Sequence, residues 1–191
     1  LPFAPPKVAL LDLENSAGQI RRQVPRLMPR WDSFKGDRFR VSVRLNGLDL
    51  LRDVEQRDLI RILDAFKPDL LVTGPLYKMS SNIVDDEPAS KLISFLDDLR
   101  TTYDLALILE THEPHEVMGA TAGGIRSVRP QRPYGSSMWR RWPEFGFCLY
   151  DDGRFHPWRG QRDERMWPAK FRRGVLPPLG DDEWPWVVDG T

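Results

Sequence analysis

A carboxylate directly behind an apolar run is the first feature of this sequence that could do chemistry. Glu14 follows the apolar run 7–13, and Asp12 lies two residues before it. A carboxylate at such a place can orient and deprotonate a water molecule that attacks a phosphoryl group. In an extended chain the side chains of Asp12 and Glu14 point to the same face. The alternative for Glu14 is an acid that stabilises the N-terminus of the next helix.

Carboxylates and imidazoles also follow the apolar run 104–110. The sequence there reads Glu110-Thr-His112-Glu-Pro-His115. Two histidines three residues apart can ligate a metal ion, and beside carboxylates they would suit a hydrolase. We favour a single polar sensor at His112 over a metal site, because no cysteine joins the pair and the third histidine, His156, is distant in sequence.

An arginine-rich segment without acidic residues spans 126–141. Its arginines are Arg126, Arg129, Arg132, Arg140 and Arg141. Because the whole chain has a formal net charge of zero, this is a strong local excess of positive charge. It could bind phosphates of a nucleic acid, or of a nucleotide on a neighbouring subunit. Tyr134 and Trp139 add surfaces for stacking, and the alternative is a solvated basic loop.

The composition fits a soluble globular protein. Hydrophobic residues make up 40% of the 191 residues and charged residues 29%, which argues against general disorder. The single cysteine, Cys148, excludes an intrachain disulfide framework and suits a reducing cytosol. No apolar run is long enough to span a bilayer and no signal-peptide pattern opens the chain, so we expect a cytoplasmic protein.

Apolar strands alternate with amphipathic helices over the first 110 residues. Strands are predicted over 7–13, 39–45, 69–74 and 104–110, and helices after Asn15–Ser16, through 59–66 and over about 88–100. Pro25 is expected to kink or end the first helix. This alternation predicts an α/β fold with a mostly parallel sheet flanked by helices, in which ligands bind beyond the carboxyl ends of the strands. The strand 39–45 alternates apolar and charged residues, as edge strands do.

The pattern changes beyond residue 111. Residues 119–137 are rich in Gly, Pro, Ser and Arg and predict a long, mobile loop. A strand over 144–150 and a second one at 155–158 predict a hairpin. We expect a core domain over 1–150 and a β or irregular extension over 151–191.

Four segments, in this order and spacing, resemble the RecA-like ATPases of RepA and DnaB type, including phage and actinobacterial members. They are Asp12-Leu-Glu-Asn-Ser16, Pro68-Asp-Leu-Leu-Val-Thr-Gly-Pro-Leu-Tyr77, Leu107-Ile-Leu-Glu-Thr-His112 and Gly135-Ser-Ser137. The resemblance covers residues 7 to about 150. It implies a replication-associated helicase or translocase that uses ATP and Mg²⁺, acts on DNA and assembles as a homohexameric ring.

The resemblance also implies residue roles. Glu14 matches the catalytic glutamate, the strand 70–73 the Walker B strand, and Thr111–His112 the sensor of the γ-phosphate. The arginine finger that reaches a neighbour's ATP would be one of three residues: Arg132, Arg140 and Arg141. The channel-facing loop would lie in 119–137, with four DNA-binding candidates: Gly123, Gly124, Arg126 and Arg129.

Two departures from the family pattern qualify these roles. No G-x-x-x-x-G-K-[ST] motif is present, and the resemblance implies that this P-loop lies upstream of Leu1. The chain alone is therefore expected to be a marginally stable fragment that does not bind ATP normally. Gly74 stands where the Walker B aspartate is expected. Either Asp12 helps to hold Mg²⁺, or the metal is held through water, or the site is impaired.

The missing P-loop also affects the expected sheet. In the RecA-like fold the P-loop strand is expected between the Walker B and sensor strands, so the sheet has a gap here or these two strands pair directly. Two other functions stay open. One is a non-catalytic RecA-like module that binds nucleic acid or a partner through its arginines, and Gly74 favours it. The other is a metal-dependent hydrolase built on His112, His115 and nearby carboxylates.

Overall fold

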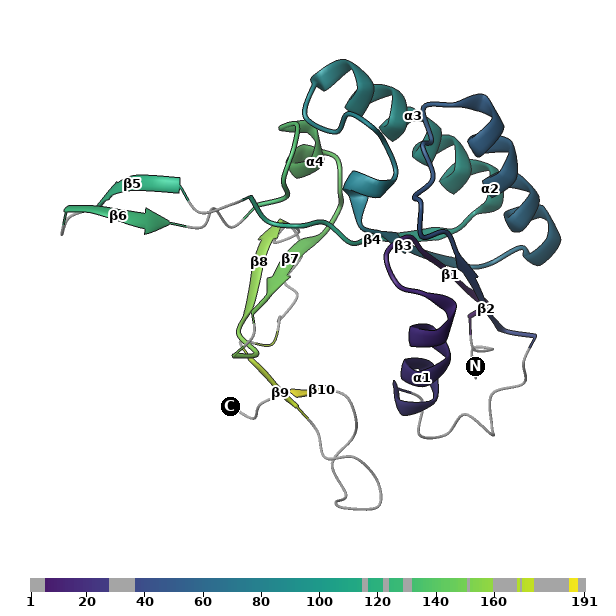
Figure 1. The fold of residues 1–191 in the computed structure, drawn as a ribbon, viewed down its shortest axis with the longest axis horizontal. Helices are drawn as coiled ribbons and strands as arrows, with labels where there is room; N and C mark the ends of the chain where they lie inside the picture. Colours follow the sequence, from purple (N-terminus) through teal and green to yellow (C-terminus); the bar gives the residue numbers. More distant parts are fainter. Residues whose placement is uncertain are drawn as a thin grey trace.

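A parallel sheet flanked by helices forms the centre of the computed structural model (Figure 1). The structure describes residues 6–27, 37–114, 117–121, 124–128, 132–150, 152–159, 168, 170–173 and 186–188. The sheet has the order β2-β1-β3-β4. Its strands are β1 (Val8–Asp12), β2 (Phe39–Val43), β3 (Leu70–Gly74) and β4 (Ala106–Leu109). The predicted α/β class and the edge position of the second strand are confirmed.

Three helices cover the sheet. They are α1 (Ala17–Leu27) on one face, and α2 (Asp53–Phe66) and α3 (Asp86–Tyr103) on the other (Figure 1). Ser16 caps α1: its hydroxyl accepts from the Gln19 N–H at 3.2 Å, and the Gln19 side chain accepts from the Ser16 N–H at 2.7 Å. Pro25 does not end α1, because the helix continues to Leu27.

The strand register brings four carboxyl ends to one edge of the sheet. Asp12 lies level with Val43 and Gly74, and Thr73 lies level with Leu109. Because β3 pairs directly with β4, no gap separates them, and direct pairing is the arrangement that this chain adopts.

The two faces of the sheet are buried to different extents. Alternate residues of the strands pack with α2 and α3 into a core whose members include Leu11, Leu59, Leu63, Leu71, Leu92 and Leu96. On the opposite face Leu10 and Val72 are only half-buried, and Ile108 of β4 is 52% exposed. The α1 side of the sheet therefore keeps apolar surface near β4 in contact with solvent.

Two hairpins follow the sheet. β5 (Val117–Thr121) and β6 (Gly124–Val128) pair antiparallel, and so do β7 (Gly146–Leu149) and β8 (Phe155–Arg159). The second hairpin was predicted, and its turn contains the boundary drawn at residue 150. The first hairpin contradicts the predicted loop over 119–128, whereas the described residues 132–137 form neither helix nor strand. β-Branched residues at 117, 121, 125 and 128 favour strands in the hairpin, although glycine and serine dominate the composition.

A short helix, α4 (Met138–Arg141), packs against the start of α3. Trp139 is 2% exposed, and its indole N–H donates to the Ile83 carbonyl at 3.0 Å. The backbone N–H of Ser136 donates to the same carbonyl, and the Ser136 hydroxyl bonds to Asp86. At Gly135 φ is +111°, and a Cβ would lie 2.5 Å from the Ile83 oxygen, so this turn requires glycine.

The last strands of the described chain are β9 (Phe171–Arg173) and β10 (Trp186–Val188), which pair antiparallel. Among the described residues, no helix has the length and apolar character needed to cross a membrane.

Candidate active site

The turn after β1 fixes the backbone of Glu14. One oxygen of the Asp12 carboxylate accepts from the N–H groups of Glu14 and Asn15, at 2.9 and 2.6 Å. Its other oxygen accepts from the Asn15 side-chain amide at 2.9 Å. Both oxygens of Asp12, which we expected to serve a cofactor, thus organise the turn that presents Glu14.

Gly74 ends β3 where the chain passes very close to the end of β4. Its φ is +152°, a conformation that residues with a side chain rarely adopt. A Cβ at this position would lie 2.5 Å from Cβ of Glu110 and 3.0 Å from its backbone N and O. A glycine at this position is therefore a steric requirement of this fold, and an aspartate would not fit.

Glu110 follows β4 and lies across from Gly74. Its N–H donates to the Thr73 carbonyl, and its own carbonyl accepts from the Leu76 N–H, both at 2.9 Å. These bonds fix the backbone from which Glu110 and His112 project. Side-chain ligand atoms of Glu14, Glu110 and His112 all lie within 4.8 Å of one another. The predicted convergence at the carboxyl edge is thus present for these three residues, which we call the edge cluster.

Tyr77 belongs to the same place, and the sequence analysis gave it no role. It lies in the 3₁₀ turn η2 (Leu76–Lys78). Its hydroxyl donates to Oε1 of Glu14 at 2.9 Å, and its ring centroid lies 5.1 Å from that of His112, with 60° between the planes. The one signal for it in the sequence is an aromatic residue just behind the Gly74-Pro75 strand end.

The edge cluster is electrostatically coupled. Partial burial raises the pKa of Glu110, and the charges of Glu14 and Asp12 raise it further while His112 opposes them. Glu110 stays exposed by surface area, so solvent screens much of this effect. The hydrogen bond to Glu14 is the largest of the causes that raise the pKa of Tyr77.

The edge cluster supplies two carboxylates and an imidazole, all exposed to solvent. Carboxylates suit hard cations, and together with an imidazole they also suit zinc or manganese. This set differs from the predicted metal pair, because it includes Glu14 in place of His115. His115 lies outside the described residues. Chemically, the edge cluster can accept a proton from water or hold a divalent cation.

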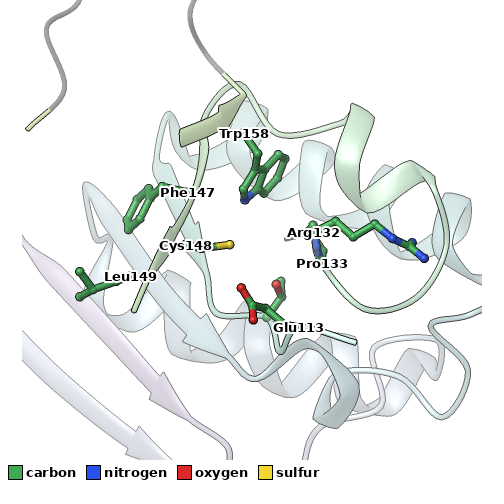
Figure 2. A pocket seen from close by; sticks show the side chains of 8 residues that line it. Glu113, Arg132, Pro133, Phe147, Cys148, Leu149 and Trp158 are labelled. Atoms are coloured by element: carbon green, nitrogen blue, oxygen red, sulfur yellow. The ribbon is translucent and has the colours of Figure 1, made fainter. Parts of the chain in front are cut away.

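A cavity of about 150 Å³ lies between β7–β8 and the loop after β4 (Figure 2). Its lining residues are Thr111, Glu113, Arg132, Pro133, Phe147, Cys148, Leu149 and Trp158. Figure 2 shows the Trp158 indole and the Glu113 carboxylate on either side of the Cys148 sulfur. Trp158 covers Gly146, where a Cβ would lie 2.2 Å from its ring. Thr111, which we expected at the nucleotide, thus lines this cavity.

Cys148 is expected to resist alkylation. Burial, reinforced by a hydrogen bond to Glu113, raises the pKa of its thiol to about 12. At pH 8 the thiolate fraction is then on the order of a thousand times smaller than for an ordinary cysteine with a pKa near 8.5. We expect iodoacetamide to modify the folded chain more slowly than the urea-unfolded chain by roughly that factor, beyond any steric protection. Glu113→Gln should speed the reaction, and equal rates in all three samples would contradict this account.

The predicted arginines are not gathered at the edge cluster. Arg140 and Arg141 lie exposed on α4. Arg132 lies at the rim of the cavity beside Cys148, with its guanidinium pointing away from it (Figure 2). Within the described part of the chain, no hydrogen bond or ion pair joins them to Glu14, Glu110 or His112.

Two of the four DNA-binding candidates lie in the first hairpin. In β6, Arg126 lies level with Gly119, and Gly124 with Thr121. Gly123 and Arg129 lie outside the described residues. One backbone bond links this region to the edge cluster, because the Tyr134 N–H donates to the His112 carbonyl at 2.8 Å.

A scan against protein-family models found no match, and a search of curated proteins found none either.

Proposed function

We propose that this chain contributes the catalytic edge of an ATP-hydrolysing motor of the RecA-like, helicase type. The observation that carries the proposal is the edge cluster, in which Glu14 lies with Glu110 and His112 at the carboxyl edge of a parallel sheet. Ligands of such sheets bind at this edge. A glutamate held there by a turn is suited to orient and deprotonate the water that attacks a γ-phosphate.

Each member of the edge cluster has a distinct role in this proposal. Glu14 accepts the proton of the attacking water. His112 senses the terminal phosphate, since its side chain lies beside those of Glu14 and Glu110 and its carbonyl accepts a hydrogen bond from the Tyr134 N–H. Mg²⁺ would neutralise phosphate charge when bound. Glu110 is the carboxylate best placed to face it, because Asp12 is engaged in its turn and Gly74 admits no side chain.

The surface of the sheet agrees with a phosphate grip supplied by residues outside this sequence, which contains no P-loop motif. Ile108 and the half-buried Leu10 and Val72 leave an apolar face near β4. A helix that starts at a phosphate-binding loop could pack on this face, beside the edge cluster.

The arginine-rich segment supports a role in an oligomer that binds DNA. Arg140 and Arg141 are exposed and lie on α4, apart from the edge cluster of their own chain. An arginine finger acts on the nucleotide of the adjacent subunit and needs this exposure. The hairpin β5–β6, whose strand β6 contains Arg126, projects away from the sheet and would be the part that contacts a nucleic acid (Figure 1).

ATP hydrolysis by the product of the whole reading frame that contains this sequence tests the proposal. We expect DNA-stimulated turnover, and we expect Arg140→Ala or Arg141→Ala to lower it about a thousandfold while ATP binding stays within a few-fold. Arg61→Ala is the matched control, because Arg61 is exposed on α2 and pairs with Asp58. Absence of turnover from the intact product would reject the motor and favour a non-catalytic module that binds nucleic acid.

A metal-dependent hydrolase is the second candidate, favoured by the 4.8 Å grouping of two carboxylates with His112. It requires stoichiometric Zn²⁺ or Mn²⁺ on the purified chain. Titration of these ions into the wild type and into Glu110→Gln separates the two candidates, since only a hydrolase of this kind should show tight binding that the substitution removes.

A further inference from the structure

Tyr77 projects from one of the most firmly held turns of the molecule. The neighbouring Leu76 is 1% exposed, and its N–H donates to the Glu110 carbonyl at 2.9 Å. Within the turn, the Lys78 N–H donates to the Pro75 carbonyl and the Met79 N–H to that of Leu76. The backbone of Tyr77 is thus fixed to the loop that carries Glu110, while its side chain stays 40% exposed.

The side chain of Tyr77 joins two groups that come from different strands. Glu14 follows β1 and lies 63 residues away in sequence, yet it accepts a 2.9 Å hydrogen bond from the phenol. His112 follows β4, and its ring lies against that of Tyr77. Glu14 is an exposed side chain with several rotamers open to it, so the phenol restricts it to a subset of them.

We propose that Tyr77 is a positioning residue: its hydroxyl holds one carboxylate oxygen of Glu14 while its ring supports His112, so that both face the same reacting phosphate. This role rests on the proposed function. Because Oε1 takes the phenol hydrogen bond, Oε2 is the oxygen that accepts the proton of the attacking water. Correct orientation of a catalytic group contributes to rate even when the positioning residue never touches the substrate.

The first arm of the test is spectroscopic and needs no activity. Ultraviolet titration of phenolate in the 191-residue chain, taken as wild type minus Tyr77→Phe, isolates the Tyr77 phenol. Its midpoint should lie above the ordinary value of 10, and in a Glu14→Ala background, which removes the acceptor, it should move back toward 10. Tyr103 serves as a control, because its hydroxyl donates to Asp64, between α3 and α2. Its midpoint, taken as wild type minus Tyr103→Phe, should be the same with and without the substitution of Glu14. An unchanged midpoint in Glu14→Ala would overturn the Tyr77–Glu14 contact.

The second arm measures steady-state ATP hydrolysis by the whole gene product. Tyr77→Phe keeps the ring against His112 and removes only the hydroxyl, so kcat should fall about tenfold with KM unchanged. Tyr77→Ala removes both contacts and should lower kcat further, while Tyr103→Phe should leave it intact. Full activity in Tyr77→Phe beside loss of activity in Glu14→Gln would reject the positioning role and leave the motor standing. A wild type without turnover would reject both, and the titration would still report the contact.

Discussion

Replacing Gly74 by alanine is expected to destabilise the protein by about 3 kcal/mol or more. The added Cβ would meet Cβ of Glu110 at 2.5 Å and its backbone at 3.0 Å, at a φ of +152°. Backbone strain and steric overlap with the adjoining backbone segment at Glu110 are both among the mechanisms that produce large losses of stability. Urea denaturation followed by circular dichroism measures the free energy of unfolding.

Gly18→Ala is the matched control for this substitution. Gly18 lies in α1, and a Cβ there would have the Arg22 guanidinium as its nearest neighbour, at 3.6 Å. Alanine in a helix should be neutral or stabilise by about 0.5–1 kcal/mol. Gly74→Asp extends the test, because it would introduce the acid that the sequence resemblance led us to expect at this position. We expect it to destabilise at least as much as alanine, and a variant that unfolds at the wild-type midpoint would contradict the steric explanation.

Replacing Glu14 by glutamine is expected to lower ATP hydrolysis by the whole gene product by about 10²- to 10⁴-fold, the usual contribution of a general base. Glutamine keeps the shape of the side chain and an oxygen that can accept from the Tyr77 hydroxyl, but it cannot take a proton from water. The affinity for ATP should therefore stay nearly unchanged while kcat falls.

Single-turnover kinetics and a fluorescent-nucleotide binding assay separate these two quantities. Glu87→Gln is the control, because Glu87 is an exposed acid of α3 that pairs only locally with Lys91. If Glu14→Gln retained most of the wild-type turnover, Glu14 would instead be an acid that merely stabilises the N-terminus of α1, the alternative that its position in the sequence left open.

Local patterns predicted most of the fold because they carry the strongest physical signals. Apolar runs such as 69–74 can be buried only in a sheet covered on both faces, and helices with an apolar stripe supply that cover. Prediction was wrong over 119–128, where the glycines concealed the strand preference of a few β-branched residues, whereas the described residues 132–137 form neither helix nor strand. It also left open whether the strands now seen as β3 and β4 touch, since pairing of parallel strands depends on the whole sheet.

The candidate site was predictable in one respect. Glu14 and His112 follow predicted strands and Glu110 ends one, and the carboxyl ends of parallel strands share one edge. The roles within it were not predictable. Three features depend on distances that no local pattern encodes. The Asp12 carboxylate is hydrogen-bonded within its turn, position 74 has no room for a side chain, and Tyr77 contacts Glu14, which lies 63 residues away in sequence.

The bond from the Tyr134 N–H to the His112 carbonyl has a mechanical consequence. The segments on either side of the hairpin β5–β6 lie together: Glu113 and Pro133 line the same cavity, and the Tyr134 N–H donates to the His112 carbonyl. The two segments that flank the hairpin are therefore anchored beside one another. A partner that binds the hairpin is therefore expected to act on backbone that adjoins His112, whose imidazole lies with Glu14 and Glu110.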